Sequence, residues 1–179
     1  TLRPGMFVHA AVVDAPDRLL RRPIGLMDAD FVNKTITLAI QAKGEGTCKL
    51  CSVTAGDTID ILAPAGNGFD PTKGAGTVWL AGGGVGVAPL LYAAKCYTPH
   101  YTLRAFLGFR CRESVFADSE ISHYCHTTLC TDDGSAGFHG TVVDAMEKAL
   151  SADDLLPDLV LACGPTPMLK GVQSFCLSH

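Results

Sequence analysis

The stretch VWLAGGGVGVAPLLYAAK, residues 78–95, decides the fold of this chain. Its first four residues form a short apolar run that is typical of a buried strand, and residues 89–95 have the composition of a helix. Between them stands a turn that needs unusual backbone angles, made by Gly82, Gly83, Gly84 and Gly86. Because the bare amides at a helix start attract anions, the stretch predicts a loop that binds the pyrophosphate of a dinucleotide.

Other interpretations of this stretch stay open. Residues 74–94 carry no charge and are long enough for a membrane span, but the glycine cluster and Pro89 favour a strand, a loop and a helix. A glycine-rich junction can also be a structural turn without a ligand. The fingerprint of dinucleotide-binding dehydrogenases fits imperfectly, since Val87 stands where its third glycine belongs and no acid follows the next strand. The loop therefore belongs to another lineage of phosphate sites.

The composition indicates a globular protein that acts on small molecules or proteins. The chain has 179 residues, of which 47% are apolar and 18% charged, with a formal net charge of -4. That charge argues against nucleic acid and against an anionic membrane surface as partners. Eight cysteines without regular spacing or a visible secretory signal indicate reduced thiols and a cytoplasmic location.

No metal site is expected in this sequence. Cys48 and Cys51 form the only CxxC pair, and no second pair lies near them to complete a four-thiolate site. His123, Cys125, His126 and Cys130 lead into an expected strand and lack the usual ligand spacing. Both groups are interpreted as ordinary structural residues.

The rhythm of the sequence changes near residue 74 and predicts two domains. The first part is strand-like, with strands expected at 6–13, 23–28, 35–42 and 58–62, as in a small β-barrel. Four strands would leave open barrel edges, so this domain is expected to be truncated at its N-terminus and the chain to be a fragment. Strands and helices then alternate at 78–81, 89–96, 101–109, 113–119, 126–131, 142–150, 159–162 and 168–175, which predicts a parallel sheet covered by helices. We expect domains at 1–73 and 74–179, joined by a linker at 70–76.

Motifs gather where the strands of the second domain end. Ligands of such folds bind outside the carboxyl ends of the strands, and these ends carry residues 82–86, 108–110, 131–135 and 163–165. The thiol of Cys163 would stand at a strand tip, either as a small buried residue or as a reactive group. In the first domain, residues 22–25 and 44–47 could hold a second phosphate-bearing cofactor, or be a hairpin turn and a helix cap.

Taken in order, the motifs resemble the ferredoxin reductase-like flavoprotein superfamily over nearly the whole chain. Within it, they are most similar to the family of electron-transfer subunits of NAD-dependent dihydroorotate dehydrogenase. The motifs are RRPIG (21–25), GEGT (44–47), PAGNGF (64–69), AGGGVGVAPL (81–90), TDDGS (131–135) and ACGPTPML (162–169).

The resemblance implies an FAD-binding β-barrel followed by an NAD-binding α/β domain. By that resemblance the FAD-binding residues are Arg22, Pro23, Ile24, Gly25, Ala39, Ile40, Gln41, Gly46 and Thr47. The implied NAD residues are Gly83, Gly84, Val85, Gly86, Gly164 and Pro165, with the thiol of Cys163 as the catalytic residue beside the nicotinamide. The family commonly has serine where Gly25 stands, which leaves backbone amides to contact the flavin ring at this position.

Residues 131–135 predict NAD(H) rather than NADP(H). NADP-selective relatives place serine and arginine here, whereas this chain has Asp132. Its carboxylate would repel a 2′-phosphate but can accept hydrogen bonds from a ribose hydroxyl.

The implied function is electron transfer between NAD(H) and a catalytic dehydrogenase subunit through FAD, in dihydroorotate oxidation for pyrimidine biosynthesis. The family also carries a [2Fe-2S] cluster, whose ligands are absent from this sequence, and Cys176 is not assigned to it. One alternative is the small subunit of a hydrogenase, a sulfide dehydrogenase or a ferredoxin:NADP oxidoreductase. Another is a non-catalytic nucleotide-binding module.

Overall fold

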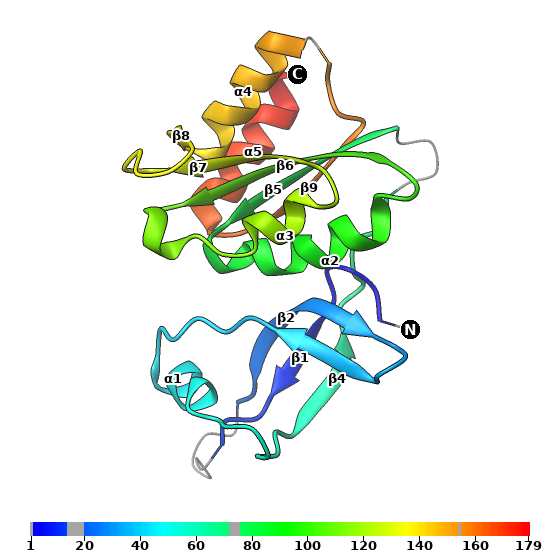
Figure 1. Cartoon of the computed structure of the whole chain (residues 1–179), viewed down its shortest axis with the longest axis vertical. Helices are drawn as coiled ribbons and strands as arrows, with labels where there is room; N and C mark the ends of the chain where they lie inside the picture. The colour runs from blue at the N-terminus through cyan, green and yellow to red at the C-terminus, as the bar shows by residue number, and fades with distance from the viewer. Residues whose placement is uncertain (1, 14–19, 72–75, 154) are drawn as a thin grey trace.

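The computed structural model describes residues 2–13, 20–71, 76–153 and 155–179, which form two β-sheets with a helix between them (Figure 1). The first sheet is antiparallel and has four strands in the order β3-β2-β1-β4. Its strands are β1 (Phe7–Ala10), β2 (Arg22–Asp30), β3 (Thr35–Leu38) and β4 (Ile61–Ala65), and helix α1 (Glu45–Cys51) connects the last two.

One face of this first sheet forms a small core. In β1 the buried residues alternate with half-buried ones, as expected for a strand that faces a core on one side. Val8 and Leu26 are fully buried, and Leu50 of α1 packs against the same cluster. The apolar alternation of the sequence thus determines which face of the sheet is buried.

The second sheet is parallel and has five strands in the order β8-β7-β6-β5-β9. Its strands are β5 (Thr77–Gly83), β6 (Thr102–Phe109), β7 (His126–Thr131), β8 (Phe138–His139) and β9 (Leu159–Cys163). Six of the seven residues of β5 are buried, because helices cover both faces of the sheet.

The helices divide between the two faces of the parallel sheet (Figure 1). Helices α2 (Val87–Tyr97) and α3 (Asp118–Ser122) lie on the side of the first sheet, and α4 (Val142–Asp153) and α5 (Thr166–Ser178) cover the opposite face. Short 3-10 turns, η1 (Gly84–Gly86) and η2 (Arg112–Ser114), follow β5 and β6. The expected strand and helix alternation is confirmed.

Several expected boundaries were wrong. The strand expected at 35–42 ends at Leu38, because its ladder with β2 stops at the pair Leu26 and Leu38. The strand expected at 58–62 is β4 at 61–65, and it tolerates Pro64 because it lies at the edge of the sheet. The helix expected at 113–119 is η2 followed by α3, and β8 was not expected.

Two further expectations concern the linker and the membrane. The predicted domain boundary between residues 73 and 74 lies outside the described residues. In the part of the chain that the structure describes, no helix is long and apolar enough to cross a bilayer. Residues 77–83 of the uncharged segment form strand β5 instead.

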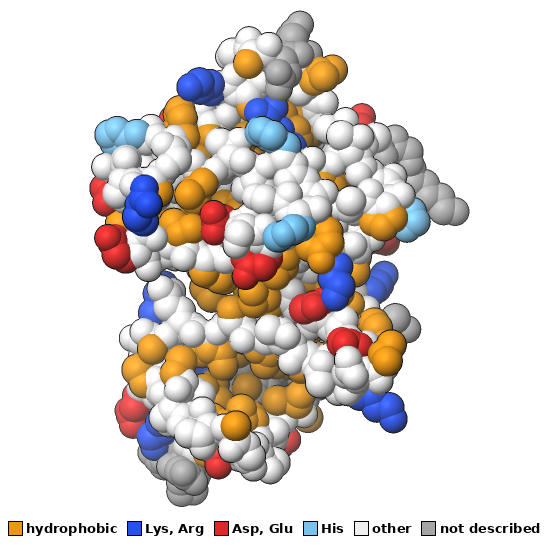
Figure 2. Space-filling view, viewed as in Figure 1, with side chains coloured by type: hydrophobic (Ala, Val, Ile, Leu, Met, Phe, Trp, Pro, Cys, Tyr) orange, Lys and Arg blue, Asp and Glu red, His pale blue; other side chains and the backbone are white. Residues whose placement is uncertain are grey.

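Helix α2 connects the two sheets through side chains on both of its sides. Leu90 and Ala93 belong to the core of the parallel sheet, whereas Tyr92 is 3% exposed within the core of the antiparallel sheet. On the viewed face, hydrophobic side chains gather where the two domains meet (Figure 2). The two domains therefore share one buried seam along α2.

Candidate functional site

The chain has two predicted cofactor sites, one in each sheet domain. One lies at the carboxyl ends of β5 and β9, and the other at the start of β2 and of α1. In the parallel sheet, β6 and β7 extend from one side of β5 and β9 returns on the other side. The ends of β5 and β9 therefore form a topological switch point, where open α/β sheets bind ligands.

The predicted NAD loop and the predicted nicotinamide motif are in contact at this switch point. Gly82 and Cys163 are paired in the parallel ladder. A Cβ added to Gly83 would lie 2.6 Å from Met168 Sδ, and one added to Gly164 would lie 3.0 Å from the amide nitrogen of Gly83. A Cβ on Gly86 would collide with the carbonyl oxygen of Cys163. Three of the glycines are thus required by close packing of the two loops.

Gly84 has a different reason to be glycine. Its φ is +53°, and a Cβ there would meet no atom within 4 Å, so the backbone angle and not the space favours glycine. The neighbouring Val85 side chain is 38% exposed. The backbone of this turn is therefore open to a ligand at the start of α2, an eleven-residue helix whose N-terminal end favours anions.

The thiol of Cys163 is half-buried at the tip of β9. Burial raises the pKa of this thiol above its ordinary value, so Cys163 carries a neutral thiol at physiological pH. A neutral thiol is a weak nucleophile, which favours a contact role over a covalent one. Its predicted catalytic role stays a prediction.

Asp132, which is predicted to bind the ribose, directly follows β7. Its amide donates to the carbonyl oxygen of Phe109 at 3.0 Å, which continues the ladder between β6 and β7 by one residue. The side chain is exposed. Thr131 before it is fully buried, and its Oγ1 donates to the carbonyl oxygen of Ala136 at 2.7 Å.

On the flavin side, the structure brings Arg22 and Gly46 together although they lie far apart in the sequence. A Cβ on Gly46 would lie 2.7 Å from Arg22 Nε, so the guanidinium rests against the glycine backbone in the first turn of α1. Arg22 Nη1 donates to the carbonyl oxygen of Leu20 at 2.7 Å, which orients the group. A fixed guanidinium beside the bare backbone of Gly46 suits a diphosphate.

Thr47 shapes the same turn from inside. Its Oγ1 accepts hydrogen bonds from the amides of Lys43 and Gly44, both at 3.0 Å, and donates to the carbonyl oxygen of Gly44 at 2.9 Å. This confirms the short helix expected after residue 44. The hydroxyl is engaged within the protein, so a contact of Thr47 with a diphosphate would come from its backbone amide.

The remaining flavin residues differ in their exposure. Ile24 is buried in the core of the first sheet and Pro23 is exposed. Ala39 and Ile40 are half-buried and Gln41 is exposed, in an irregular segment after β3. This segment is held to α1, where the thiol of Cys51 lies 3.6 Å from the carbonyl oxygen of Ile40.

Gly25 lies directly against helix α2. A Cβ on Gly25 would be 2.7 Å from Cγ of Pro89, so this position has no room for a side chain in the present packing. The present packing therefore leaves no space for the serine that the family commonly has here. It also brings the predicted flavin strand within contact of the helix that follows the NAD loop.

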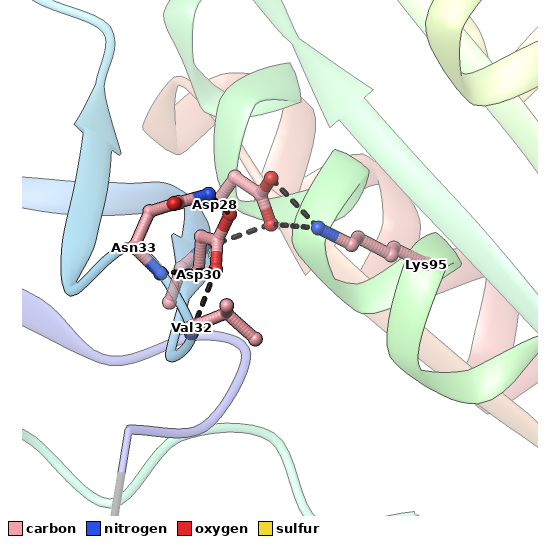
Figure 3. A network of polar contacts seen from close by, with 6 residues as sticks. Asp28, Asp30, Val32, Asn33 and Lys95 are labelled. Atoms are coloured by element: carbon pink, nitrogen blue, oxygen red, sulfur yellow. Dashed lines mark hydrogen bonds and ion pairs between the residues drawn. The ribbon is translucent and has the colours of Figure 1, made fainter.

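Polar contacts fix the seam further along α2 (Figure 3). Lys95 Nζ lies 2.8 Å from both carboxylate oxygens of Asp28 on β2, and this ion pair raises the pKa of Lys95. Beside it, Asp30 accepts hydrogen bonds from the amide and the side-chain Nδ2 of Asn33 and from the amide of Val32, which lower the pKa of its carboxyl group. Tyr97 Oη donates to the carbonyl oxygen of Phe69 at 2.8 Å.

Sequence reasoning missed the residues that support the site. Pro89 and Met168 pack against Gly25 and Gly83, and Arg112 donates to the carbonyl oxygen of Ser135 at 3.1 Å. Arg112 and Ser135 follow neighbouring strands of the parallel sheet. Their positions after those strands could have indicated the contact, but the rotamers that join them could not be read from the sequence.

The described residues contain no cluster of three or more His, Cys, Asp or Glu side chains that could hold a metal ion. All eight cysteines are free thiols, and Cys48 and Cys51 are both exposed on α1. Nothing in the described structure therefore supplies the ligands of an iron–sulfur cluster.

Comparisons with known proteins agree with this geometry. No protein-family model matches the chain. The electron transfer subunit of dihydroorotate dehydrogenase B (NAD(+)) from Enterococcus faecalis is 40% identical over 180 residues, which cover 99% of this chain and 68% of that protein. The subunit of the same name from Bacillus caldolyticus is 39% identical, over 95% of this chain and 66% of that protein. The chain thus spans about two thirds of the length of these curated relatives.

Solved structures with the same fold include flavin-dependent oxidoreductases. The structure of an NADH-dependent reduced ferredoxin-NADP oxidoreductase, described for flavin-based electron bifurcation, has a TM-score of 0.84 and 31% identity over 98% of this chain and 60% of that one. The FAD/NAD-binding domain of a nitric oxide dioxygenase from Vibrio cholerae has a TM-score of 0.80 and 16% identity over 99% of this chain and 80% of that one. At that identity the second match shows the fold alone.

In the antiparallel sheet, Arg22 of β2 lies against the first turn of α1, and the adjoining parallel sheet has a glycine loop at its switch point. Together these features define the ferredoxin reductase-like class of FAD- and NAD-binding flavoproteins. Within that class, the chain belongs to the family of electron transfer subunits of dihydroorotate dehydrogenase B (NAD(+)).

Proposed function

We propose that this chain binds FAD beside its antiparallel sheet and NAD(H) at the switch point of its parallel sheet, and transfers reducing equivalents between NAD(H) and a partner dehydrogenase. The observation that carries the proposal is the contact between Gly25 and Pro89. It joins the strand predicted to bind the flavin ring to the helix that follows the predicted NAD loop, so two cofactors bound there would meet at the seam.

The residues on the flavin side fit FAD. Arg22 offers a fixed positive charge, and Gly46 leaves its backbone bare where a Cβ would displace that guanidinium. We propose that both hold the diphosphate, together with the amide of Thr47, and that Pro23, Ile24, Gly25, Ala39, Ile40 and Gln41 surround the flavin.

The residues on the NAD side fit a dinucleotide. The turn at Gly84 and Val85 exposes backbone at a helix start, which suits a pyrophosphate. We propose that Gly83 and Gly86 shape this turn and that Asp132 binds the ribose. Cys163, Gly164 and Pro165 would then border the nicotinamide.

When bound, the two cofactors would supply hydride transfer and the conversion of an electron pair into single electrons. The protein contributes binding, orientation and exclusion of water at the seam. No side chain is required as a general acid or base, and the raised pKa of Cys163 keeps its thiol protonated beside the nicotinamide.

The partner and the pathway belong to the same proposal. The names of the relatives support a catalytic dihydroorotate dehydrogenase subunit as partner, and hence a place in pyrimidine biosynthesis. We propose that a [2Fe-2S] cluster held outside this chain relays the electrons. Eight free thiols support a cytoplasmic location.

An absorption experiment tests the cofactor proposal. The purified chain, mixed with FAD and desalted, should keep a flavin band that bleaches on addition of NADH without oxygen. Arg22→Gln should retain less FAD, whereas Arg3→Gln, at an arginine outside the site, should retain as much as the wild type. A folded chain that keeps no flavin would contradict the proposal. A chain that binds FAD and NADH without bleaching would support the non-catalytic module.

A second candidate partner is favoured by the structural match at 31% identity. That match is an NADH-dependent reduced ferredoxin-NADP oxidoreductase, so the chain could serve the corresponding complex. Copurification with the catalytic subunit of either enzyme from the same genome distinguishes the two. Binding to the dihydroorotate dehydrogenase subunit alone is the expected result.

A further inference from the structure

Two neighbouring carboxylates follow β7, and their surroundings differ. Asp133 Oδ1 accepts hydrogen bonds from the amide and from the hydroxyl of Ser135, at 2.9 and 2.6 Å. These bonds lower the pKa of the Asp133 carboxyl group. Across the described residues, no hydrogen bond or ion pair engages the exposed carboxylate of Asp132. Both carboxylate oxygens of Asp132 are therefore available to a ligand, whereas Oδ1 of Asp133 is engaged by Ser135.

Ser135 is tied in turn to the loop after β6. The amide of Arg112 donates to Ser135 Oγ at 2.8 Å, and Arg112 Nε donates to the carbonyl oxygen of Ser135 at 3.1 Å. Asp133, Ser135 and Arg112 thus form one chain of hydrogen bonds between two loops that follow neighbouring strands. We call this chain of bonds the 133–135–112 latch.

The latch holds the backbone that follows Asp132, and the parallel sheet holds the backbone that precedes it. The amide of Asp132 is bonded to Phe109, and the amide of Asp133 donates to the carbonyl oxygen of Arg110 at 3.3 Å. Gly134 has a φ of +70°, and a Cβ there would lie 2.9 Å from Cγ of His139, so the turn between the two halves of the latch is tight. Without the latch, the backbone that follows Asp132 would lose its connection to η2.

We propose that the 133–135–112 latch positions Asp132 for the ribose diol and thereby sets the preference for NAD(H) over NADP(H). The inference rests on the proposed function, because it assumes that NAD(H) binds at this edge of the sheet. Arg112, Ser135 and Asp133 are positioning residues, and Asp132 is the residue that contacts the ribose.

The chemistry explains why position matters. A carboxylate held beside the diol accepts hydrogen bonds from hydroxyl groups and repels a 2′-phosphate, and both effects weaken as the carboxylate moves away or becomes screened by water. A carboxylate on a loose loop would still be charged but would discriminate less. If charge alone set the preference, loss of either carboxylate would lower the preference for NADH equally. If a fixed position is also needed, only the loss of the Asp132 carboxylate should lower it strongly.

Four variants separate these possibilities. Ser135→Ala removes the hydroxyl that joins both ends of the latch, and Ser135→Thr restores it. Asp133→Asn removes the charge but keeps an Oδ1 that can accept both bonds from Ser135. Asp132→Asn removes the ribose carboxylate itself.

The measurement is the dissociation constant of NADH and of NADPH, obtained by equilibrium dialysis of the FAD-loaded chain, together with the thermal midpoint. We expect Asp132→Asn to lower the NADH preference by about tenfold or more, and Ser135→Ala by about three- to tenfold, the value of one hydrogen bond. Ser135→Thr and Asp133→Asn should keep the wild-type preference.

The inference would be overturned if Ser135→Ala left the ratio of the NADPH to the NADH dissociation constant unchanged. A purely structural role of Ser135 would give this result, because both dinucleotides would then bind more weakly by the same factor. A loss in Asp133→Asn as large as in Asp132→Asn would also overturn the inference, because charge alone would then suffice. If the wild-type chain binds neither dinucleotide, the proposed function itself is contradicted. If Asp132→Asn alters the preference for NADH and Ser135→Ala does not, only the latch is contradicted.

Discussion

The packing of Gly25 against Pro89 yields a prediction that can be worked from the structure. In Gly25→Ala the new Cβ would lie 2.7 Å from Cγ of Pro89, closer than carbon atoms approach, and both groups belong to backbone or ring atoms with little freedom. Overpacking of this kind costs about 1–3 kcal/mol. Replacing glycine by alanine in an allowed backbone conformation returns about 0.4–1 kcal/mol through the unfolded state.

The expected net loss is therefore at most about 2.6 kcal/mol, and about 1.3 kcal/mol at the middle of both ranges. For a chain of this size, about 1 kcal/mol corresponds to about 2–4 °C in the thermal midpoint. The midpoint of Gly25→Ala should thus fall by about 3–5 °C, and by at most about 10 °C, in differential scanning calorimetry.

A double-mutant cycle with Pro89→Ala isolates the contact. Removal of Cγ from residue 89 opens the space that a Cβ at position 25 would need, so the double variant should be more stable than the sum of the single changes predicts. The coupling should be about 1 kcal/mol or more. Single changes that simply add would refute the claim that this contact excludes a side chain at position 25.

Further predictions concern the loop, acid stability and the thiols. Gly84→Ala should weaken NADH binding and cost about 1–2 kcal/mol of stability, because its φ of +53° is unfavourable for alanine; an unchanged melting curve would contradict this. The pKa of Asp158 is lowered by bonds from the amides of Thr77 and Gly76, so the stability it contributes is present above about pH 4 and is lost as pH falls through its lower folded pKa. In Asp158→Asn the urea midpoint of unfolding should therefore change less with pH between about pH 5 and 2.5 than in the wild type. Iodoacetamide at about pH 7.5 should modify exposed Cys48 before Cys163, whose thiol pKa is raised by burial, and peptide mass spectrometry gives the order.

The sequence could predict those features that local chemistry determines. The glycines and the apolar run before them predicted β5, the turn and α2. A buried strand selects apolar residues and a positive φ selects glycine, so both can be recognised in the sequence. The short helix after Gly44 was also predictable, since Thr47 closes its first turn by itself.

Other features depend on contacts between distant residues. The end of β3 depends on where β2 stops pairing with it, and the placement of β4 depends on its edge position. The contact between Arg22 and Gly46 and the latch at Ser135 join residues from separate loops. The types of the two residues in each contact are compatible with it, but they do not determine which residues come together. The roles of the candidate site residues in cofactor binding stay predictions.

Helix α2 has a consequence for dividing this protein into parts. It lies in the half of the sequence that carries the parallel sheet, yet Tyr92 completes the core of the other half and Lys95 neutralises Asp28 there. A piece starting at residue 76 would present that ring and Pro89 to water, and the complementary piece would lose part of its interior. In a chimera of two relatives, the α2 side chains that pack on the antiparallel sheet would have to come from the same protein as that sheet. The two halves of the sequence are therefore not interchangeable modules.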